Sequence, residues 1–147
     1  MANFSLEKYK RLNGKYLEDG EKLLQSGDLL QAGEKFWGAA AEIVKAVAAK
    51  EGRHLRTHNQ IWSYLLDLDE KHSGLGLRRD FVSAGYLHAN FYEEELTPRT
   101  VRKLVMTSGA SSRRCRDFSD GAQPILSVSG CAPCLDFSIR RSDAPSS

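Results

Sequence analysis

Histidine is the residue type in this chain most suited to metal binding or acid–base chemistry. His54 and His58 are four residues apart, a separation that can place two metal ligands on one face of a helix. Gly52 precedes this pair and Thr57, a typical helix-capping residue, lies inside it, so one continuous helix over both is not expected. No carboxylate is placed to complete such a site. We therefore expect no metal here.

The three cysteines lie late in the chain. Cys131 and Cys134 form a lone C-x-x-C, and Cys115 is left over. Redox and zinc sites with this spacing need a βαβ context or a second ligand pair, and the sequence has neither. Walker-type and Rossmann-type glycine loops are also missing from the sequence, so no cofactor is expected.

A further histidine, His88, lies in an amphipathic stretch, in helical register with Phe81 and Phe91. Two interpretations follow. His88 is either a core histidine whose ring nitrogens are hydrogen-bonded, or a site residue in a crevice with Asn90 and Tyr92 nearby. The apolar register favours the core.

Two tryptophans could stack on nucleic-acid bases. Trp37 follows Phe36 and Trp62 follows Ile61, within patterns of helical spacing. This context favours packing or a dimer contact for both rings.

Helices must position these residues, because apolar side chains recur at three- and four-residue steps through most of the chain. The first helix is expected to follow an N-cap at Ser5 and to end at Ser26-Gly27. Asp28 caps a second helix, which is rich in alanine and stops at Gly52.

Three more helices complete the pattern. Thr57 and Gln60 form a T-x-x-Q capping box that begins the third helix, which ends at Ser73-Gly74. A fourth apolar face runs over 81–92, and Thr97-Pro98 begins a short fifth helix. Strand-like alternation is missing and the connections are short, so the sequence predicts an all-α, up-and-down antiparallel bundle.

The composition is that of an ordinary globular protein. Hydrophobic residues make up 41% and charged residues 27% of 147 residues, with a net charge of +2, too small an excess to indicate non-specific phosphate binding. Glu42 and Lys45 interrupt the longest apolar run, so no membrane association is expected. The N-terminal residues do not resemble a signal peptide, which predicts a cytoplasmic protein.

The composition changes abruptly after Met106. All nine Lys and all ten Glu precede Thr107, whereas 107–147 holds ten Ser, five Arg, all three Cys and three of the four Pro. We expect a helical domain over 1–106 and a poorly ordered Ser/Arg-rich tail over 107–147. The tail is either a genuine linker or a frame-shifted or read-through end.

Two segments carry a family resemblance. The run EKFWGAAA at 34–41 and the run LHANFYE at 87–93, taken with the sequence around them, resemble the PaREP family of archaeal proteins over roughly residues 5–105. That family is usually placed among HEPN-type helical bundles. The resemblance implies an antiparallel helical bundle, a homodimer formed through helix faces, and a link to nucleotides or RNA.

Many HEPN proteins are metal-independent ribonucleases in which four to six residues separate an Arg from the His that follows it. Arg53 and His58 fit that spacing. His58 would remove a proton from a ribose 2′-OH, and Arg53 would stabilise the developing phosphorane charge. The motif lies earlier in the chain than it does in those ribonucleases, which argues against catalysis.

The function that these patterns favour is a non-catalytic, self-associating helical binding or accessory module of the HEPN type, linked to RNA or nucleotides. The alternative is a toxin-like, metal-independent endoribonuclease that uses Arg53 and His58. A protein partner, a specific ligand and a pathway do not follow from the sequence.

Overall fold

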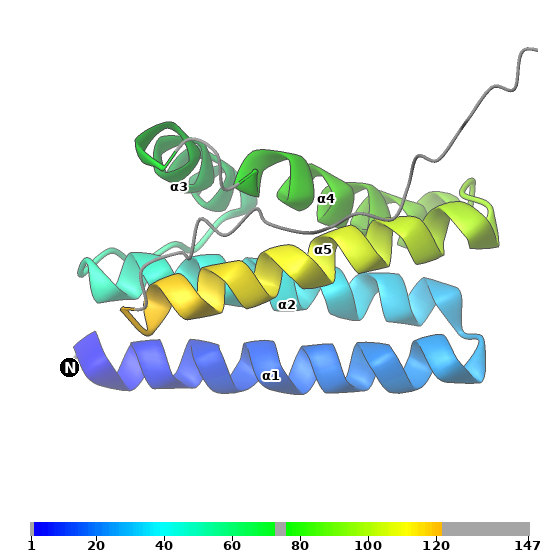
Figure 1. The fold of residues 1–147 in the computed structure, drawn as a ribbon, viewed down its shortest axis with the longest axis horizontal. Helices are drawn as coiled ribbons and strands as arrows, with labels where there is room; N and C mark the ends of the chain where they lie inside the picture. Colours follow the sequence, from blue (N-terminus) through cyan, green and yellow to red (C-terminus); the bar gives the residue numbers. More distant parts are fainter. Residues whose placement is uncertain (1, 73–75, 122–147) are drawn as a thin grey trace, which may run out of the picture.

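The computed structural model describes residues 2–72 and 76–121 of the chain. These residues form five helices and no strand: α1 (Ala2–Ser26), α2 (Leu29–Lys50), α3 (His58–Lys71), α4 (Leu77–Glu93) and α5 (Pro98–Ser119) (Figure 1). The predicted all-α bundle is confirmed. None of the five helices combines the length and apolar character that crossing a membrane requires.

The second helix is the centre of the bundle. Within the described residues, α2 packs against all four other helices. Figure 1 shows α1 along one side of α2 and α4 and α5 along the other, while the shorter α3 is viewed almost end-on. Seven alanines and two glycines among the 22 residues of α2 allow its neighbours to approach closely. A helix that is apolar around most of its circumference is stable only when other elements surround it.

Helix starts follow the capping signals in the sequence. The side chain of Asp28 accepts a hydrogen bond from the backbone N–H of Gln31 at 3.1 Å. Thr57 and Gln60 form the complete reciprocal capping box at the start of α3. The prediction that Ser5 caps the first helix is wrong, because α1 already begins at Ala2. No glycine or proline precedes Ser5, so nothing in the sequence stops the helix from extending upstream.

The prediction that the helical pattern ends at Met106 is also wrong. Helix α5 continues to Ser119, so residues 107–119 are not a poorly ordered tail. The buried side chains of this segment are small, and they continue the buried stripe of α5 without large apolar groups. The buried positions of this stripe follow one another in steps of four and three: Val101, Val105, Ser108, Ser112, Cys115 and Ser119. The rest of the predicted tail, 122–147, lies outside the described residues, as does Ser73-Gly74.

Polar contacts also tie the end of α5 to the bundle. The guanidinium of Arg116 donates a hydrogen bond to Asn13 Oδ1. Asn13, which is fully buried in α1, donates in turn to the backbone carbonyl of Ala39 in α2 at 2.7 Å. Lys10 forms an ion pair with Asp120 just beyond α5. Three helices therefore share one polar contact chain at this end of the bundle.

Candidate functional site

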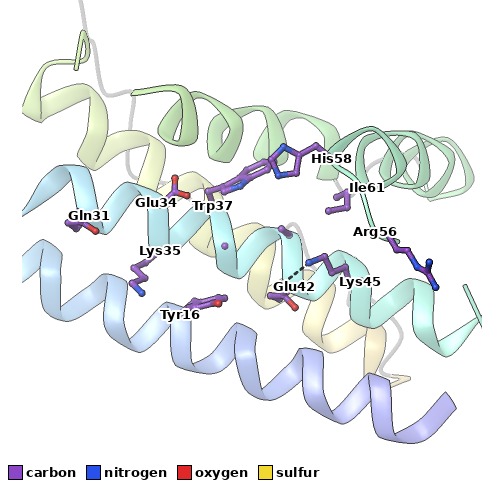
Figure 2. Close-up of a pocket in the computed structure, with 12 residues that line it drawn as sticks. Tyr16, Gln31, Glu34, Lys35, Trp37, Glu42, Lys45, Arg56, His58 and Ile61 are labelled. Atoms are coloured by element: carbon purple, nitrogen blue, oxygen red, sulfur yellow. Dashed lines mark hydrogen bonds and ion pairs between the residues drawn. The ribbon is translucent and has the colours of Figure 1, made fainter. Parts of the chain in front are cut away.

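A cavity of about 390 Å³ lies between α1, α2 and the start of α3 (Figure 2). Its volume falls in the range of small-molecule sites. The lining combines rings, cations and carboxylates rather than aliphatic groups alone. The lining residues are Tyr16, Gln31, Glu34, Lys35, Trp37, Gly38, Ala41, Glu42, Lys45, Arg56, His58 and Ile61.

Three rings from three helices meet at one wall of this cavity. Trp37 of α2 lies nearly parallel to His88 of α4, with ring centroids 5.0 Å apart and planes inclined by 19°. His58, the first residue of α3, meets Trp37 edge-on at 5.4 Å and His88 edge-on at 5.5 Å. Figure 2 shows the Trp37 and His58 rings side by side in the cavity wall. The bundle thus brings together residues far apart in the chain.

A carboxylate orients one of these histidines. Nδ1 of His88 lies 2.7 Å from Glu34 Oε2, and both side chains are about one-quarter to one-third exposed. With Glu34 ionised, the Nδ1–H group donates to the carboxylate, and Nε2 of the neutral ring is left as an acceptor. His88 therefore has a hydrogen-bonded nitrogen, as a core histidine needs, while it remains beside the cavity wall.

The second half of the loop before α3 is held in place by a buried side chain and by a helix cap. Leu55 is buried, which anchors the loop to the core. Beyond it, Gln60 Oε1 accepts hydrogen bonds from the backbone N–H groups of Arg56 and Thr57 at 2.7 and 3.2 Å. These hydrogen bonds fix the backbone around Arg56 and His58, two residues that line the cavity.

Charged groups line the cavity unevenly. Lys45 is paired with Glu42 Oε1 at 2.7 Å, and the other oxygen of Glu42 is buried without a hydrogen-bond partner among the described residues. Lys35 lies 4.0 Å from Asp19. No described residue forms an ion pair with the guanidinium of Arg56, which Figure 2 places at one end of the cavity. The cavity thus offers an exposed, unpaired cation to a ligand, whereas the free oxygen of Glu42 is buried beneath its surface.

The two residues of the predicted ribonuclease motif, Arg53 and His58, do not lie in the same site. His58 lines the cavity, whereas Arg53 does not. The guanidinium carbon of Arg53 lies 4.9 Å from the ring centroid of Tyr64. Burial, reinforced by the negative charge of Glu51, raises the pKa of Tyr64 above its ordinary value. The arginine that shares the cavity with His58 is Arg56, three residues later.

Asn90 and Tyr92, the residues predicted to form a crevice with His88, have different surroundings. Tyr92 is 71% exposed and meets His88 edge-on at 5.5 Å. Asn90 is buried, and its Oδ1 accepts a hydrogen bond from the backbone N–H of Leu96 at 2.7 Å, which holds the turn from α4 into α5. Asn90 is therefore bound to the turn, and only Tyr92 of this pair adjoins His88.

Several cavity residues were not singled out from the sequence. Glu34, Lys35 and Lys45 interrupt the otherwise apolar α2, and Glu34, Gly38, Ala41 and Lys45 follow one another at helical spacing. The sequence therefore does contain a signal for this side of the cavity, since charged and small residues share one face of α2. By contrast, Arg56 lies in a loop where no periodicity marks it.

The described residues do not group three or more His, Cys, Asp or Glu side chains in a way that could hold a metal ion. His54 is exposed in the loop before α3. Cys115 is buried in α5, whereas Cys131 and Cys134 lie outside the described residues.

Comparison with known proteins assigns the bundle to a family. The model of the archaeal PaREP1/PaREP8 family matches residues 8–107. The chain belongs to this family. The match covers most of α1, all of α2, α3 and α4, and nearly half of α5, which includes every residue that lines the cavity. It says nothing of the wider HEPN grouping, which stays a prediction.

A solved structure has the same fold. The chain is similar to a Sulfolobus solfataricus protein of known crystal structure, with 24% identity and a TM-score of 0.61, over 76% of this chain and 95% of the other. At this identity the similarity shows the fold alone. No curated protein matches the chain.

Proposed function

We propose that this protein is a non-catalytic helical binding module whose cavity between α1, α2 and α3 takes a mononucleotide-like ligand. The observation that carries the proposal is the unpaired Arg56 guanidinium in the same cavity as the rings of Trp37 and His58. An arginine binds a phosphate through charge-assisted hydrogen bonds, and aromatic rings pack against a base.

The charges in the cavity support this ligand class. Lys35 and Lys45 add positive potential, although both have acidic neighbours, Asp19 and Glu42. Arg56 is exposed, so its charge is available to a phosphate, and an apolar ligand would make no use of it.

Calorimetric titration with AMP tests the proposal. Wild-type protein should bind AMP saturably, and Arg56→Ala should weaken binding by about tenfold or more, as expected for loss of a charge-assisted hydrogen bond. Arg53→Ala is the matched control, since Arg53 lies outside the cavity lining, and it should bind AMP like the wild type. Inorganic phosphate should bind more weakly than AMP because it makes no ring contact.

Lack of saturable AMP binding at millimolar concentrations would contradict the proposal. So would an equal loss of affinity in both arginine variants, because binding would then depend on the general charge of the loop rather than on the cavity.

The proximity of His58, His88 and Glu34 favours a second candidate, a metal-independent endoribonuclease. His58 would remove the proton from a ribose 2′-OH as the O2′–P bond forms. His88, protonated and paired with Glu34, would give a proton to the 5′-oxygen as the P–O5′ bond breaks. Arg56, rather than Arg53, lies in the cavity to stabilise the phosphorane charge.

Incubation of structured RNA with the protein in EDTA tests this candidate. Cleavage that is lost in both His58→Ala and His88→Ala would support it. Cleavage that survives either substitution, or no cleavage by the wild type, would exclude these histidines as a catalytic pair.

A further inference from the structure

The outer face of α4 is apolar at positions where a surface helix is ordinarily polar. Val82 is 37% exposed and Tyr86 is 59% exposed, and Gly85 and Ala89 complete the stripe. Between this stripe and Trp62 of α3 lies a groove of about 320 Å³ whose lining contains no carboxylate, lysine or arginine. Such a stripe commonly marks a contact with another protein chain.

Glycine at position 85 gives the groove its shape. A Cβ atom there would lie 3.3 Å from the Trp62 ring, closer than most side chains tolerate. The Trp62 ring is also packed edge-on against Phe81 at 4.7 Å, so it cannot easily move aside. Gly85 therefore lets the Trp62 ring pack directly on the backbone of α4, where this ring forms one side of the groove.

Charges of opposite sign flank the apolar stripe. Arg78 and Arg79 are exposed at the start of α4, and Glu93 is exposed at its end. Steps of three and four residues place Arg78, Val82, Ala89 and Glu93 on one face of the helix. Arg78 lies 3.9 Å from Asp69 and Arg79 lies 3.3 Å from Asp80.

These arginine pairs leave both side chains accessible, since the Arg78 and Arg79 side chains remain 67% and 79% exposed. The Arg78–Asp69 pair lies at the surface, contributes little to stability and can exchange partners, whereas Asp80, the partner of Arg79, is buried. No ion pair joins Glu93 to another residue in the described part of the chain. Both ends of the face can therefore pair with charges on a second molecule.

We propose that this face of α4 packs antiparallel against α4 of a second copy of the chain, about a two-fold axis that passes between Gly85 and Tyr86. Charge complementarity selects this occupant. The axis places Arg78 of each copy opposite Glu93 of the other, and the two-fold symmetry repeats this pair at both ends of the contact.

The same register also matches the sizes of the remaining side chains. It sets the large Tyr86 against Gly85, and Val82 against Ala89. It sets the Arg79 guanidinium beside the exposed Tyr92 ring, an arrangement suited to a cation–π contact. A parallel pairing would instead bring like charges together at both ends of the helix.

This contact would border the cavity without depending on it. His88 lines the groove and also stacks on Trp37, so one ring separates the two regions. The dimer does not require ligand binding, and its test is independent of the AMP titration.

Sedimentation equilibrium of the full chain at 1–100 µM tests the dimer. The wild type should dimerise in this range. Arg78→Glu and Glu93→Arg should each raise the dimer dissociation constant by about tenfold or more, because each homodimer would then contain two like-charge contacts. Arg102→Glu, an exposed charge reversal on α5, is the matched control and should dimerise like the wild type.

A mixture of the two variants decides the register. In the mixed dimer, the Glu at position 78 of the first chain faces the Arg at position 93 of the second, and Arg78 of the second chain faces Glu93 of the first. The dissociation constant of the mixed dimer should therefore return toward the wild-type value. The double variant Arg78→Glu/Glu93→Arg should also dimerise. A monomeric wild type at 100 µM would overturn the proposal, as would a mixture that associates no better than its components. Far-UV circular dichroism should show every variant to be helical.

Discussion

The cavity and the α4 groove are neighbours with opposite chemistry. The cavity is lined by three basic residues, a histidine and two glutamates. The groove is lined by Trp62, Val82, Gly85, Tyr86, His88 and Ala89, none of which is a carboxylate, lysine or arginine. The stacked rings of Trp37 and His88 separate the two. The difference indicates separate tasks: the cavity suits a small polar ligand, and the groove suits another helix.

The largest effect is expected from Trp37, because its ring is part of the wall between the two regions. Trp37→Ala should lower the free energy of unfolding by about 3–5 kcal/mol, the usual cost of removing a buried aromatic side chain. It should also weaken both AMP binding and dimerisation. Chemical denaturation with urea measures the loss of stability.

Trp62→Ala is the matched variant, and it should cost less because Trp62 is only partly buried. A loss of less than about 1 kcal/mol for Trp37→Ala would contradict the stabilising role of this ring. Unchanged AMP binding and dimerisation would show that the two regions do not share its support.

Tyr86→Glu should weaken dimerisation without changing AMP binding. It places a charge at the centre of the proposed α4 contact, so the dimer dissociation constant should rise at least about thirtyfold, as for a binding hot spot. AMP affinity should stay unchanged, because Tyr86 does not line the cavity. Sedimentation and calorimetry on the same sample measure both constants. A parallel fall in AMP affinity would contradict the separation.

A smaller effect is expected from Glu34→Gln, which keeps a hydrogen bond to His88 but removes the charge. AMP affinity should change by less than about threefold, because Glu34 holds His88 rather than the phosphate. RNA cleavage, if the wild type shows it, should fall much further. Equal losses in binding and cleavage would assign Glu34 to ligand contact instead.

The smallest effect is expected from Tyr64, the residue whose ring lies against Arg53, and it concerns the pH dependence of stability. Burial raises the pKa of Tyr64, so the folded protein holds its proton at a pH where the unfolded chain releases it. The stability that this neutral hydroxyl contributes is complete below about pH 10 and declines as the pH rises further. Tyr64→Phe should therefore flatten the decline in thermal stability between about pH 10 and 12.

Tyr92→Phe is the control for this pH dependence, since Tyr92 is exposed, and it should leave the decline unchanged. An identical decline in wild type and Tyr64→Phe would show that Tyr64 is not the group responsible.

Local signals were sufficient to predict most of the helices. The Asp28 cap, the Thr57–Gln60 box and Pro98 each mark a helix start at the observed position, because capping depends on residues three apart or fewer. The second half of α5 escaped prediction because serine and cysteine give no hydrophobic period. Their burial depends on how closely α5 approaches α2, which is a tertiary property.

The candidate site was predictable only in part. Trp37, His58 and His88 were each singled out by residue type, but their meeting depends on how α2, α3 and α4 cross. The Arg53–His58 spacing indicated one pair, whereas the loop places Arg56 in the cavity lining instead. Spacing along a loop does not determine which side chain lines the cavity.

A crystal structure of the protein grown with saturating AMP tests the central claim most directly. We expect the phosphate at Arg56 and the base against the rings of Trp37 and His58. AMP bound in the α4 groove, or AMP absent from the cavity at saturating concentration, would contradict a nucleotide-binding function for this cavity.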